Sequence, residues 1–303
     1  MINSELLYNL INAHMNLMIE ENISDTPAVY SEENNIYRTA KLAFLKLGFI
    51  EKDAEVLGLA WKNMSDRLGK INENNWPIDI GDFRTEPFKV SKAFPRCEQD
   101  MNLYVMAPNA NWVKKLVDMD VPTVQLRFKS ENQAEIEKEI IAAIQYTNQS
   151  NTKLFINDYW QLAVRHNAYG VHLGQEDLGH LSDDDLKTLH QSGLRLGIST
   201  HGYAEMIHAH RYRPSYLALG AIFPTTLKKM PTSPQGIHRF KKYAQLMSPH
   251  YPVVAIGGID LRNISLILSP HVSAVGIVRA VINAPEPQIA VNDFKKILKT
   301  RFL

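Results

Sequence analysis

From residue 101 onward, short apolar runs alternate with longer segments whose apolar residues recur at helical spacing. Eight runs have the length of a strand, and helices are expected between them, for example over 131–148 and 183–192. The eight runs are 102–107, 122–128, 153–157, 169–174, 194–199, 215–220, 253–258 and 273–278. Eight strand–helix units in roughly 200 residues favour an α/β fold of the (β/α)8 (TIM) barrel type. An open, doubly wound sheet is the alternative.

The first 92 residues have a different pattern, in which apolar residues lie three and four positions apart. Two such helical patterns are followed by Gly48 and Gly69, as expected at helix C-termini. No motif of recognisable chemistry occurs here. We therefore expect a small, mainly helical N-terminal region, residues 1–92, of unknown role, which packs on the barrel or binds a partner. The barrel is expected to span residues 93–303.

Composition and charge restrict the possible partners. Of the 303 residues, 45% are hydrophobic and 21% are charged, as is typical of a globular protein with a large core. A formal net charge of +1 gives no long-range field that would attract nucleic acid or an anionic membrane. Any anion must therefore be bound at a local site, and we expect small-molecule substrates rather than nucleic acid or a membrane.

Cys97 is the only cysteine, which excludes an intramolecular disulfide and fits a reducing compartment. The N-terminal sequence lacks the basic segment of a secretory signal, and no run of eighteen apolar residues predicts a transmembrane helix. These observations predict a cytoplasmic protein. A homo-oligomer is compatible with them.

Polar residues at the end of the second predicted strand indicate an anion site. In a barrel of this kind, the C-terminal ends of the strands converge on the face where catalysis takes place. Gln125, Arg127 and Lys129 occupy alternate positions there, so their side chains should share one side of the chain. A strand buried on both faces would not have three polar residues at these positions. A solvent-exposed edge strand is the alternative interpretation.

Acidic residues follow the next two strands. Asn157 and Asp158 end the third strand, and Asp177 follows the fourth, 177 − 158 = 19 residues later. This separation suits one strand–helix–strand return, so the two carboxylates should lie close together. With Arg127 and Lys129 nearby, we predict Mg²⁺ that links Asp158 and Asp177 to phosphate oxygens. The alternative is that Asp177 merely begins a helix, where acids are favoured.

The later strand ends indicate a second anion site. After the fifth strand, Ser199 is expected to cap a helix or to donate to phosphate, and His201 to carry a proton or to bond the start of that helix. The sixth to eighth strands end in hydroxyls, a lysine, paired glycines and an arginine, a recurring arrangement for phosphate in this fold. Two anion sites on one face suggest that two phosphorylated substrates are joined, with pyrophosphate as leaving group.

Five longer segments closely resemble thiamine phosphate synthase. They occur in the order and at the spacing of that family, from about residue 94 to the C-terminus. They are QLRFK, INDYWQLAVRHNAYGVHLGQEDL, LRLGISTHG, RPSYLALGAIFPTTLKKMPTSPQG and PVVAIGGI. The preceding SKAFPRCEQ resembles the junction of fused proteins in which a pyrimidine kinase precedes the synthase, although 92 residues are too few for that kinase.

The resemblance implies a transferase of thiamine diphosphate biosynthesis that uses Mg²⁺. Such enzymes join 4-amino-5-hydroxymethyl-2-methylpyrimidine diphosphate to a thiazole phosphate and release pyrophosphate. The positions that it implies for the pyrimidine diphosphate are Gln125, Leu126, Arg127, Phe128, Lys129, Asn157, Ser199 and Lys228. Those for the thiazole phosphate are Thr225, Thr226, Leu227, Gly258, Val278 and Arg279. Asp158 and Asp177 are implied as Mg²⁺ ligands, and the catalytic groups as Arg127, Lys129, Ser199 and Lys228.

Departures from the family pattern concern mainly the thiazole side. Leu227 stands where the family usually has threonine, and Arg279 where it usually has serine. Asp120 and His271 replace two glycines before the second and eighth strands. Two alternatives remain: a degenerate barrel that binds ligands or regulates a partner, and a metal-independent thiazole tautomerase that relies on His201.

Overall fold

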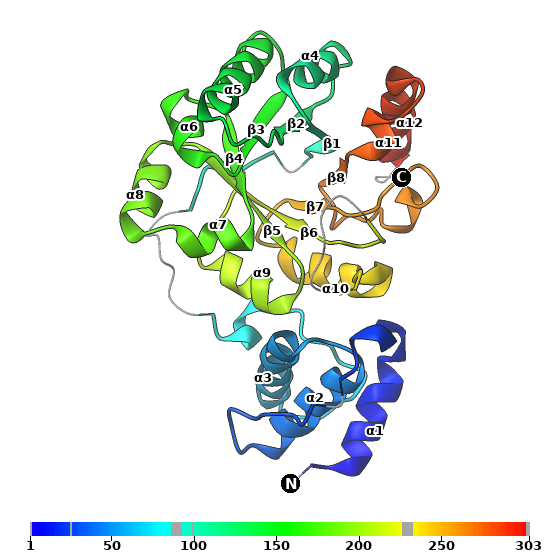
Figure 1. Cartoon of the computed structure of the whole chain (residues 1–303). Coiled ribbons are helices and arrows are strands. Elements are labelled where there is room, and N and C mark those ends of the chain that lie inside the picture. Colours follow the sequence, from blue (N-terminus) through cyan, green and yellow to red (C-terminus); the bar gives the residue numbers. More distant parts are fainter. Residues whose placement is uncertain (1, 25, 86–92, 99, 226–232, 301–303) are drawn as a thin grey trace.

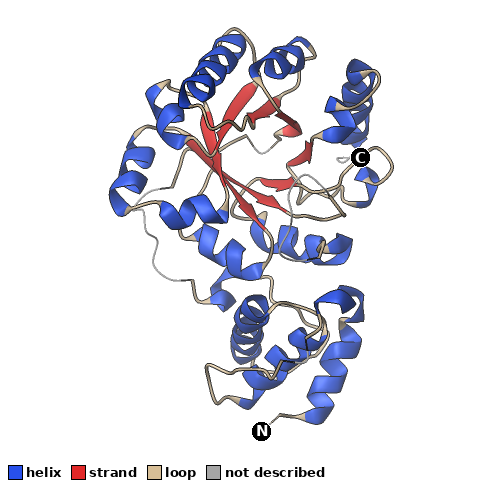
Figure 2. Ribbon diagram, viewed as in Figure 1, coloured by secondary structure: helices blue, strands red, loops and turns tan. Residues whose placement is uncertain are grey.

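The centre of the molecule is a closed barrel of eight parallel strands surrounded by helices (Figures 1 and 2). The structure, a computed structural model, describes residues 2–24, 26–85, 93–98, 100–225 and 233–300. The strands are β1 (Asn102–Ala107), β2 (Thr123–Leu126), β3 (Lys153–Asn157), β4 (Gly170–Leu173), β5 (Arg195–Thr200), β6 (Tyr216–Leu219), β7 (Val253–Ala255) and β8 (Ala274–Ile277). Each strand pairs with the next, and β8 pairs with β1, which confirms the barrel and excludes the open sheet.

The strands lie where the apolar runs predicted them, but several are shorter. The second run was predicted over 122–128, whereas β2 ends at Leu126, which pairs with Ala107, the last residue of β1. Beyond that pair β1 offers no further strand partner, so the chain turns away although its apolar alternation continues to Phe128. The polar residues after Leu126 are therefore at the barrel mouth rather than within the sheet.

Helices of the barrel lie outside the strands, as Figure 2 shows. They are α4 (Ala110–Asp118), α5 (Gln133–Thr147), α6 (Trp160–Arg165), α7 (Gln175–His180), α8 (Asp183–Gln191), α9 (Tyr203–His210), α10 (Gly236–Met247), α11 (Arg279–Ile282) and α12 (Pro287–Lys299). Asparagine side chains begin two of them, because Asn109 accepts from the backbone N–H of Trp112 and Asn132 from that of Ala134.

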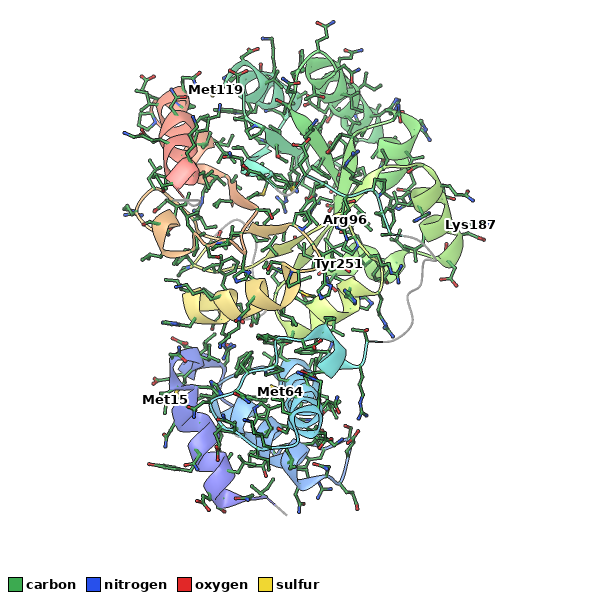
Figure 3. The ribbon with its side chains drawn as sticks, turned by 180° about the vertical axis from the view of Figure 1, so that it is seen from behind. Met15, Met64, Arg96, Met119, Lys187 and Tyr251 are labelled. Carbon is green, nitrogen blue, oxygen red and sulfur yellow. The ribbon has the colours of Figure 1, made fainter. Side chains whose placement is uncertain are left out.

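Side chains fill the barrel rather than leaving a pore. Inside it, the rings of Tyr104, Phe155 and Tyr216 pack with centroids 5.1 to 6.0 Å apart. Outside it, a second layer joins strands to helices; for example, Tyr251, labelled in Figure 3, lies before β7 and its Oη is 2.7 Å from His210 Nδ1 of α9. Both layers contain buried hydroxyl groups, which need hydrogen-bond partners in an apolar interior.

The N-terminal region is helical, as its apolar spacing predicted. Its helices are α1 (Ser4–Ala13), α2 (Asn35–Lys46) and α3 (Glu51–Leu68), with 3-10 turns η1 (Met15–Leu17), η2 (Glu20–Asn22) and η3 (Ile80–Phe83). This region lies against α9 and α10 of the barrel, at the bottom of the view in Figure 1. Its boundary near residue 92 and its role stay predictions. None of the helices in the described ranges is both long and apolar enough to cross a bilayer.

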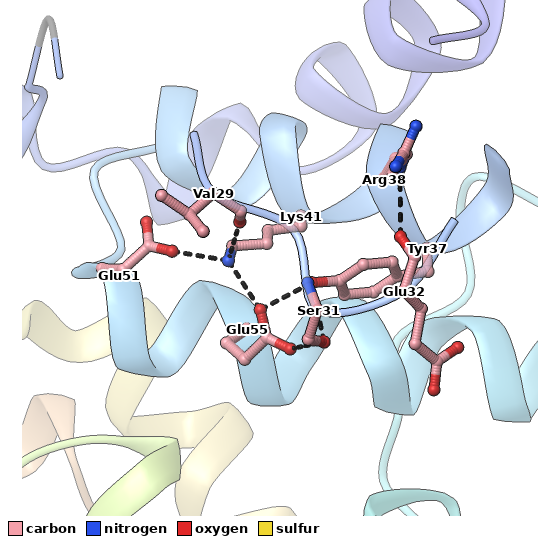
Figure 4. Close-up of polar contacts among 8 residues, drawn as sticks. All are labelled: Val29, Ser31, Glu32, Tyr37, Arg38, Lys41, Glu51 and Glu55. Carbon is pink, nitrogen blue, oxygen red and sulfur yellow. Dashed lines mark hydrogen bonds and ion pairs between the residues drawn. The ribbon is translucent and has the colours of Figure 1, made fainter. Parts of the chain in front are cut away.

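A buried lysine joins two helices of the N-terminal region (Figure 4). Lys41 of α2, only 2% exposed, places its Nζ 2.5 Å from Glu51 Oε1 and 2.6 Å from Glu55 Oε2, both on α3, and it also donates to the carbonyl of Val29. The hydroxyl of Tyr37 donates to Glu55 over 2.6 Å. A buried ammonium is costly unless it is paired and hydrogen-bonded, so this cluster is a structural link between α2 and α3.

Candidate active site

Lys129 and Asp158 meet at the mouth of the barrel. Lys129 follows β2 and Asp158 follows β3, and Lys129 Nζ donates to Asp158 Oδ2. The backbone of Asp158 has a φ of 66°, in the left-handed region, which aspartate tolerates better than most residues. Its amide donates to the carbonyl of His172 in β4 over 3.0 Å. The backbone of β4 thus fixes the point at which the Asp158 side chain leaves the barrel.

Asp177 lies in the first turn of α7, where its Oδ2 accepts from the amide of Gly174 over 2.9 Å. Asp177 thus begins a helix, as the alternative interpretation expected, and this position leaves its role as a Mg²⁺ ligand a prediction. Asp177 nevertheless also lies near Asp158. Burial raises the pKa of the Asp177 carboxyl above its usual value, and the negative charge of Asp158 raises it further.

The two aspartates form a donor set that suits a hard divalent cation. Mg²⁺ is commonly held by one or two carboxylates and completes its coordination with waters and substrate phosphates. No group of three or more His, Cys, Asp or Glu side chains that could hold a metal occurs within the described ranges. A cation here would therefore depend on oxygen ligands from the substrate in addition to Asp158 and Asp177.

A chain of hydrogen bonds crosses the barrel interior from β2 to β5. Gln125 Nε2 donates to Tyr104 Oη over 3.0 Å, and Tyr104 Oη lies 2.7 Å from Tyr216 Oη. Tyr216 Oη lies 2.6 Å from His172 Nδ1, and His172 Nε2 lies 2.7 Å from Ser199 Oγ. This relay, as we call these five side chains, connects two of the predicted substrate-binding residues, Gln125 and Ser199.

The relay determines which way its hydrogens point. Burial lowers the pKa of His172 to about 4, so its ring is neutral and only one of its nitrogens carries a hydrogen. Because Gln125 donates to Tyr104, the Tyr104 hydrogen goes to Tyr216 and that of Tyr216 to His172 Nδ1. The hydrogen on His172 Nε2 then goes to Ser199 Oγ. The hydroxyl hydrogen of Ser199 is left for an acceptor outside the relay.

The sequence pattern points only to the two ends of the relay. Tyr104, His172 and Tyr216 lie inside the apolar strands β1, β4 and β6, where the pattern does not distinguish them from core residues. The single available signal was a histidine inside a strand-like run, GVHL. Ser199 was expected to cap a helix or to bind phosphate; it does not cap α9, whose N-cap residue is Gly202.

The other residues predicted for the pyrimidine diphosphate divide into two groups. Asn157 is buried at the end of β3, and Arg127 is half-buried at the mouth, close enough to affect the pKa of His172. Leu126 is buried in the hydrophobic core, and Phe128, beyond the end of β2, is half-buried and packs against that core. Both side chains therefore contribute to packing.

The predicted thiazole side is formed by the ends of β6, β7 and β8. The amide of Phe223 donates to the carbonyl of Gly257 over 3.0 Å, which joins the segment after β6 to the end of β7. Gly258 has a φ of 68°, and a Cβ there would lie 2.5 Å from the carbonyl oxygen of Pro224. Only glycine allows this approach. Thr225 is half-buried at the end of this segment.

Three predicted residues, Thr226, Leu227 and Lys228, lie outside the described residues. At the end of β8, Val278 is half-buried and precedes α11, and the side chain of Arg279 is exposed. Arg279, where the family usually has serine, is therefore an exposed residue at this strand end. Asp120, at another usual glycine position, has a φ of 53°, so the left-handed backbone is kept without glycine.

His201 bonds the start of α9 rather than a partner in the mouth. Its Nδ1 lies 2.7 Å from Glu205 Oε2, and its backbone amide donates to the same carboxylate over 2.8 Å. This confirms the interpretation of His201 as a residue that bonds the beginning of a helix. It gives no support to a tautomerase that relies on this histidine.

Solved structures with a similar fold include thiamine phosphate pyrophosphorylase from Pyrococcus furiosus, with a TM-score of 0.57 and 24% identity, over 67% of this chain and 98% of that one. A structure of KGPDC from Streptococcus mutans gives a TM-score of 0.53 and 13% identity over 68% of this chain and 100% of that one. At these identities, both matches show the fold alone.

Comparisons of sequence find relatives of higher identity than these structures. Thiamine-phosphate synthase of Yersinia pseudotuberculosis (serotype O:1b, strain IP 31758) is 44% identical over 210 residues, which cover 69% of this chain and 96% of that protein. Thiamine-phosphate synthase of Proteus mirabilis (strain HI4320) is 46% identical over 198 residues, which cover 65% and 90%. A sequence profile described as thiamine monophosphate synthase matches residues 98–281. This chain therefore belongs to the thiamine monophosphate synthase family.

Proposed function

We propose that this chain is a transferase that makes thiamine phosphate from 4-amino-5-hydroxymethyl-2-methylpyrimidine diphosphate and a thiazole phosphate. The observation that carries the proposal is the meeting of Lys129, Asp158 and Asp177 at the barrel mouth, beside the relay that ends at Ser199. The names of the curated relatives, and the share of their length that the chain covers, support it.

The reaction breaks one bond and forms one. The C–O bond between the pyrimidine methylene carbon and the diphosphate breaks, and the electron pair leaves with pyrophosphate. The thiazole nitrogen then donates its lone pair to that carbon and forms the C–N bond of the product. Neither step requires a nucleophile or a general base from the protein, so the residues act by neutralising charge and by holding the two substrates in contact.

Arg127, Lys129 and Ser199 act on the leaving group. The guanidinium and the ammonium lie at the mouth, where they offset the charge that develops on the departing pyrophosphate. The hydroxyl hydrogen of Ser199, which the relay leaves unused, donates to a pyrophosphate oxygen. Lys228, by its place in the family pattern, is assigned to the same anion.

Asp158 and Asp177 would hold Mg²⁺, which when bound neutralises part of the diphosphate charge. The thiazole phosphate is assigned to the other side, at Thr225, Gly258 and Val278, where backbone amides approach closely. We also place the protein in the cytoplasm, because a chain whose one cysteine forms no intramolecular disulfide is compatible with a reducing compartment.

The test is an assay of pyrophosphate release coupled to mass-spectrometric detection of thiamine phosphate. Both products should form only when both substrates and Mg²⁺ are present, and chelation with EDTA should stop them until Mg²⁺ is returned. Pyrophosphate without thiamine phosphate would indicate hydrolysis alone. The absence of both products at saturating substrates and Mg²⁺ would refute the proposal and favour a barrel that only binds ligands.

A further inference from the structure

The N-terminal region is joined to the barrel by a buried arginine of α10. Arg239 is 2% exposed, its Nε donates to the carbonyl of Leu17 and its Nη2 to that of Leu47, both over 2.8 Å. The guanidinium carbon also lies 3.7 Å from the ring centroid of Phe49. All three contacts are with the N-terminal region, so a barrel residue is held in place by a part of the chain that precedes the barrel.

The same arginine reaches the segment between β6 and α10. Its Nη1 donates to Gln235 Oε1 over 3.4 Å, and Tyr243 Oη donates to the same oxygen over 2.9 Å. The backbone amide of Gln235 donates to the carbonyl of Ala221 over 2.8 Å, and that of Gly236 to Ile222 over 3.0 Å. Gln235 thus ties the end of this segment to its beginning, and Arg239 and Tyr243 hold Gln235.

The beginning of that segment belongs to the candidate thiazole side. The amide of Ile222 donates to the carbonyl of Ile256 over 3.0 Å, and the next amide donates to Gly257. A continuous series of contacts therefore runs from Leu17 and Leu47 through Arg239 and Gln235 to the glycine pair after β7. Its non-covalent links are all hydrogen bonds between described atoms.

A second contact holds the element that follows β5. Asp53 of α3 is 4% exposed and its Oδ1 accepts from the backbone amide of Ala204, in the first turn of α9, over 2.8 Å. A Cβ on Gly202 would lie 2.1 Å from Asp53 Oδ2, so the absence of a side chain makes room for the carboxylate. Trp76 Nε1 donates to Tyr203 Oη over 2.8 Å beside it. This contact lies close along the chain to Ser199, the last member of the relay.

Both buried charges of this interface bond the protein backbone. Both charges are held away from water, and this burial raises the pKa of Asp53 to about 6 and lowers that of Arg239. Such burial is costly, and packing alone would be achieved more cheaply by apolar side chains. What the charged groups add is direction. Arg239 of α10 bonds the carbonyls of Leu17 and Leu47 in the N-terminal region, and Asp53 bonds the amide of Ala204 at the start of α9.

We propose that the N-terminal region is an intramolecular brace that fixes the ends of the β6–α10 segment and thereby sets the affinity for thiazole phosphate. The choice of thiazole phosphate as the substrate rests on the proposed function, whereas the contacts of the brace do not depend on that function. The region lies outside residues 98–281, the part of the chain that matches the family profile. The N-terminal region is thus an addition to the family barrel, and it contacts the ends of the barrel's β6–α10 segment.

The test compares Arg239→Met with Lys241→Met in the full-length chain. Both variants remove one positive charge from α10, but Lys241 is exposed and serves as the control. Hydrogen exchange should quicken at the amides of Gln235 and Gly236 in Arg239→Met by about tenfold or more, since charged hydrogen bonds are lost. KM for thiazole phosphate should rise about tenfold, and KM for the pyrimidine diphosphate should change by less than about twofold. Lys241→Met should match the wild type in all three.

Arg239→Lys provides a second variant in case Arg239→Met does not fold. An ammonium keeps the charge but cannot bond two carbonyls as the guanidinium fork does, so the same changes are expected at smaller size. Faster exchange at residues 235 and 236 supports the brace even if the wild type makes no thiamine phosphate, in which case only the proposed function fails. If the Arg239 variants had a lower melting temperature but unchanged hydrogen exchange and unchanged KM values, the proposal would be refuted. The interface would then have a structural role alone.

Discussion

The two sides of the candidate site are built from different chemical groups. On the side of β2 to β5, charged and polar side chains stand at strand ends and are positioned by their neighbours, as Lys129 is by Asp158 and Ser199 by His172. On the side of β6 to β8, the described part consists mainly of backbone brought close together at Gly257 and Gly258. The first side should therefore respond to the loss of single side chains, and the second to added bulk or displacement.

The largest effect is expected from Asp158→Ala, which removes the carboxylate that pairs with Lys129. Turnover should fall by about a thousandfold, since charge stabilisation at the leaving group is lost, with no change in fold. Steady-state pyrophosphate release and circular dichroism would measure the two quantities. Asp118→Ala is the control, because Asp118 is an exposed aspartate that also pairs with a lysine, Lys114. A loss smaller than tenfold would remove Asp158 from the catalytic centre.

Tyr216→Phe should give the next largest effect. It removes the hydroxyl between Tyr104 and His172 and so disconnects Ser199 from the relay. We expect kcat to fall about tenfold to a hundredfold, the equivalent of one buried group left without its partner. Tyr251→Phe is matched to it, since Tyr251 is also a buried tyrosine with a 2.7 Å contact to a histidine, His210, outside the barrel interior.

Both tyrosine variants should lower the melting temperature, and only Tyr216→Phe should lower kcat. Equal kcat values in the two variants would mean that the relay has a packing role alone. The side of β2 to β5 would then depend on its charged residues and not on the barrel interior.

Gly258→Ala tests the opposite side with a smaller expected effect. The new residue would have to keep a left-handed φ, which alone costs about 1 to 2 kcal/mol, and its methyl group would also meet the carbonyl oxygen of Pro224. KM for thiazole phosphate should rise about tenfold, and that for the pyrimidine diphosphate should stay the same. Gly69→Ala controls for the backbone alone, since Gly69 has a φ of 64° and no neighbour within 4 Å of an added Cβ. A change in both KM values would show that the sides are not separable.

Asp53→Asn should have the smallest effect on turnover and a measurable effect on stability. Burial, with the nearby charge of Glu205, raises the pKa of Asp53 from 3.8 to about 6, although Arg239 and the amide of Ala204 lower it. The folded protein then binds a proton more tightly than the unfolded chain between these values. Its free energy of unfolding, relative to Asp53→Asn, should therefore be greatest below pH 4 and fall by about 3 kcal/mol as pH rises through 6. Urea titrations of both proteins from pH 4 to 7 would measure this difference; parallel curves would contradict it.

The parts of the site that depend on local periodicity could be predicted from the sequence. Eight apolar runs were enough for the barrel, and the barrel then placed Lys129, Asp158 and Asp177 at one end of it, because parallel strands end on the same side. The exact end of β2 could not be predicted, since it depends on where β1 stops. The residues that form a strand can be found from the local pattern, whereas the last residue of the strand depends on where the neighbouring strand ends.

The relay and the brace could not be predicted, because each depends on residues that are far apart in the sequence. Tyr104, His172 and Tyr216 come from three strands, and each is compatible with an apolar core when considered alone. Aspartate and arginine are residue types that usually lie on the surface, and Asp53 and Arg239 are buried only because the N-terminal region packs on the barrel. Side-chain networks of this kind follow from the tertiary structure and not from any period in the chain.

The aromatic contact between the two regions also has a consequence for protein engineering. Tyr203 and Tyr243 of the barrel are at most 2% exposed, and Phe83 stacks on Tyr203 with a centroid distance of 5.7 Å. Cutting the chain at residue 93 would expose these rings as an apolar patch beside an uncovered guanidinium, a surface prone to aggregation. The barrel should therefore be produced together with its N-terminal region, although the match to the family profile begins only at residue 98.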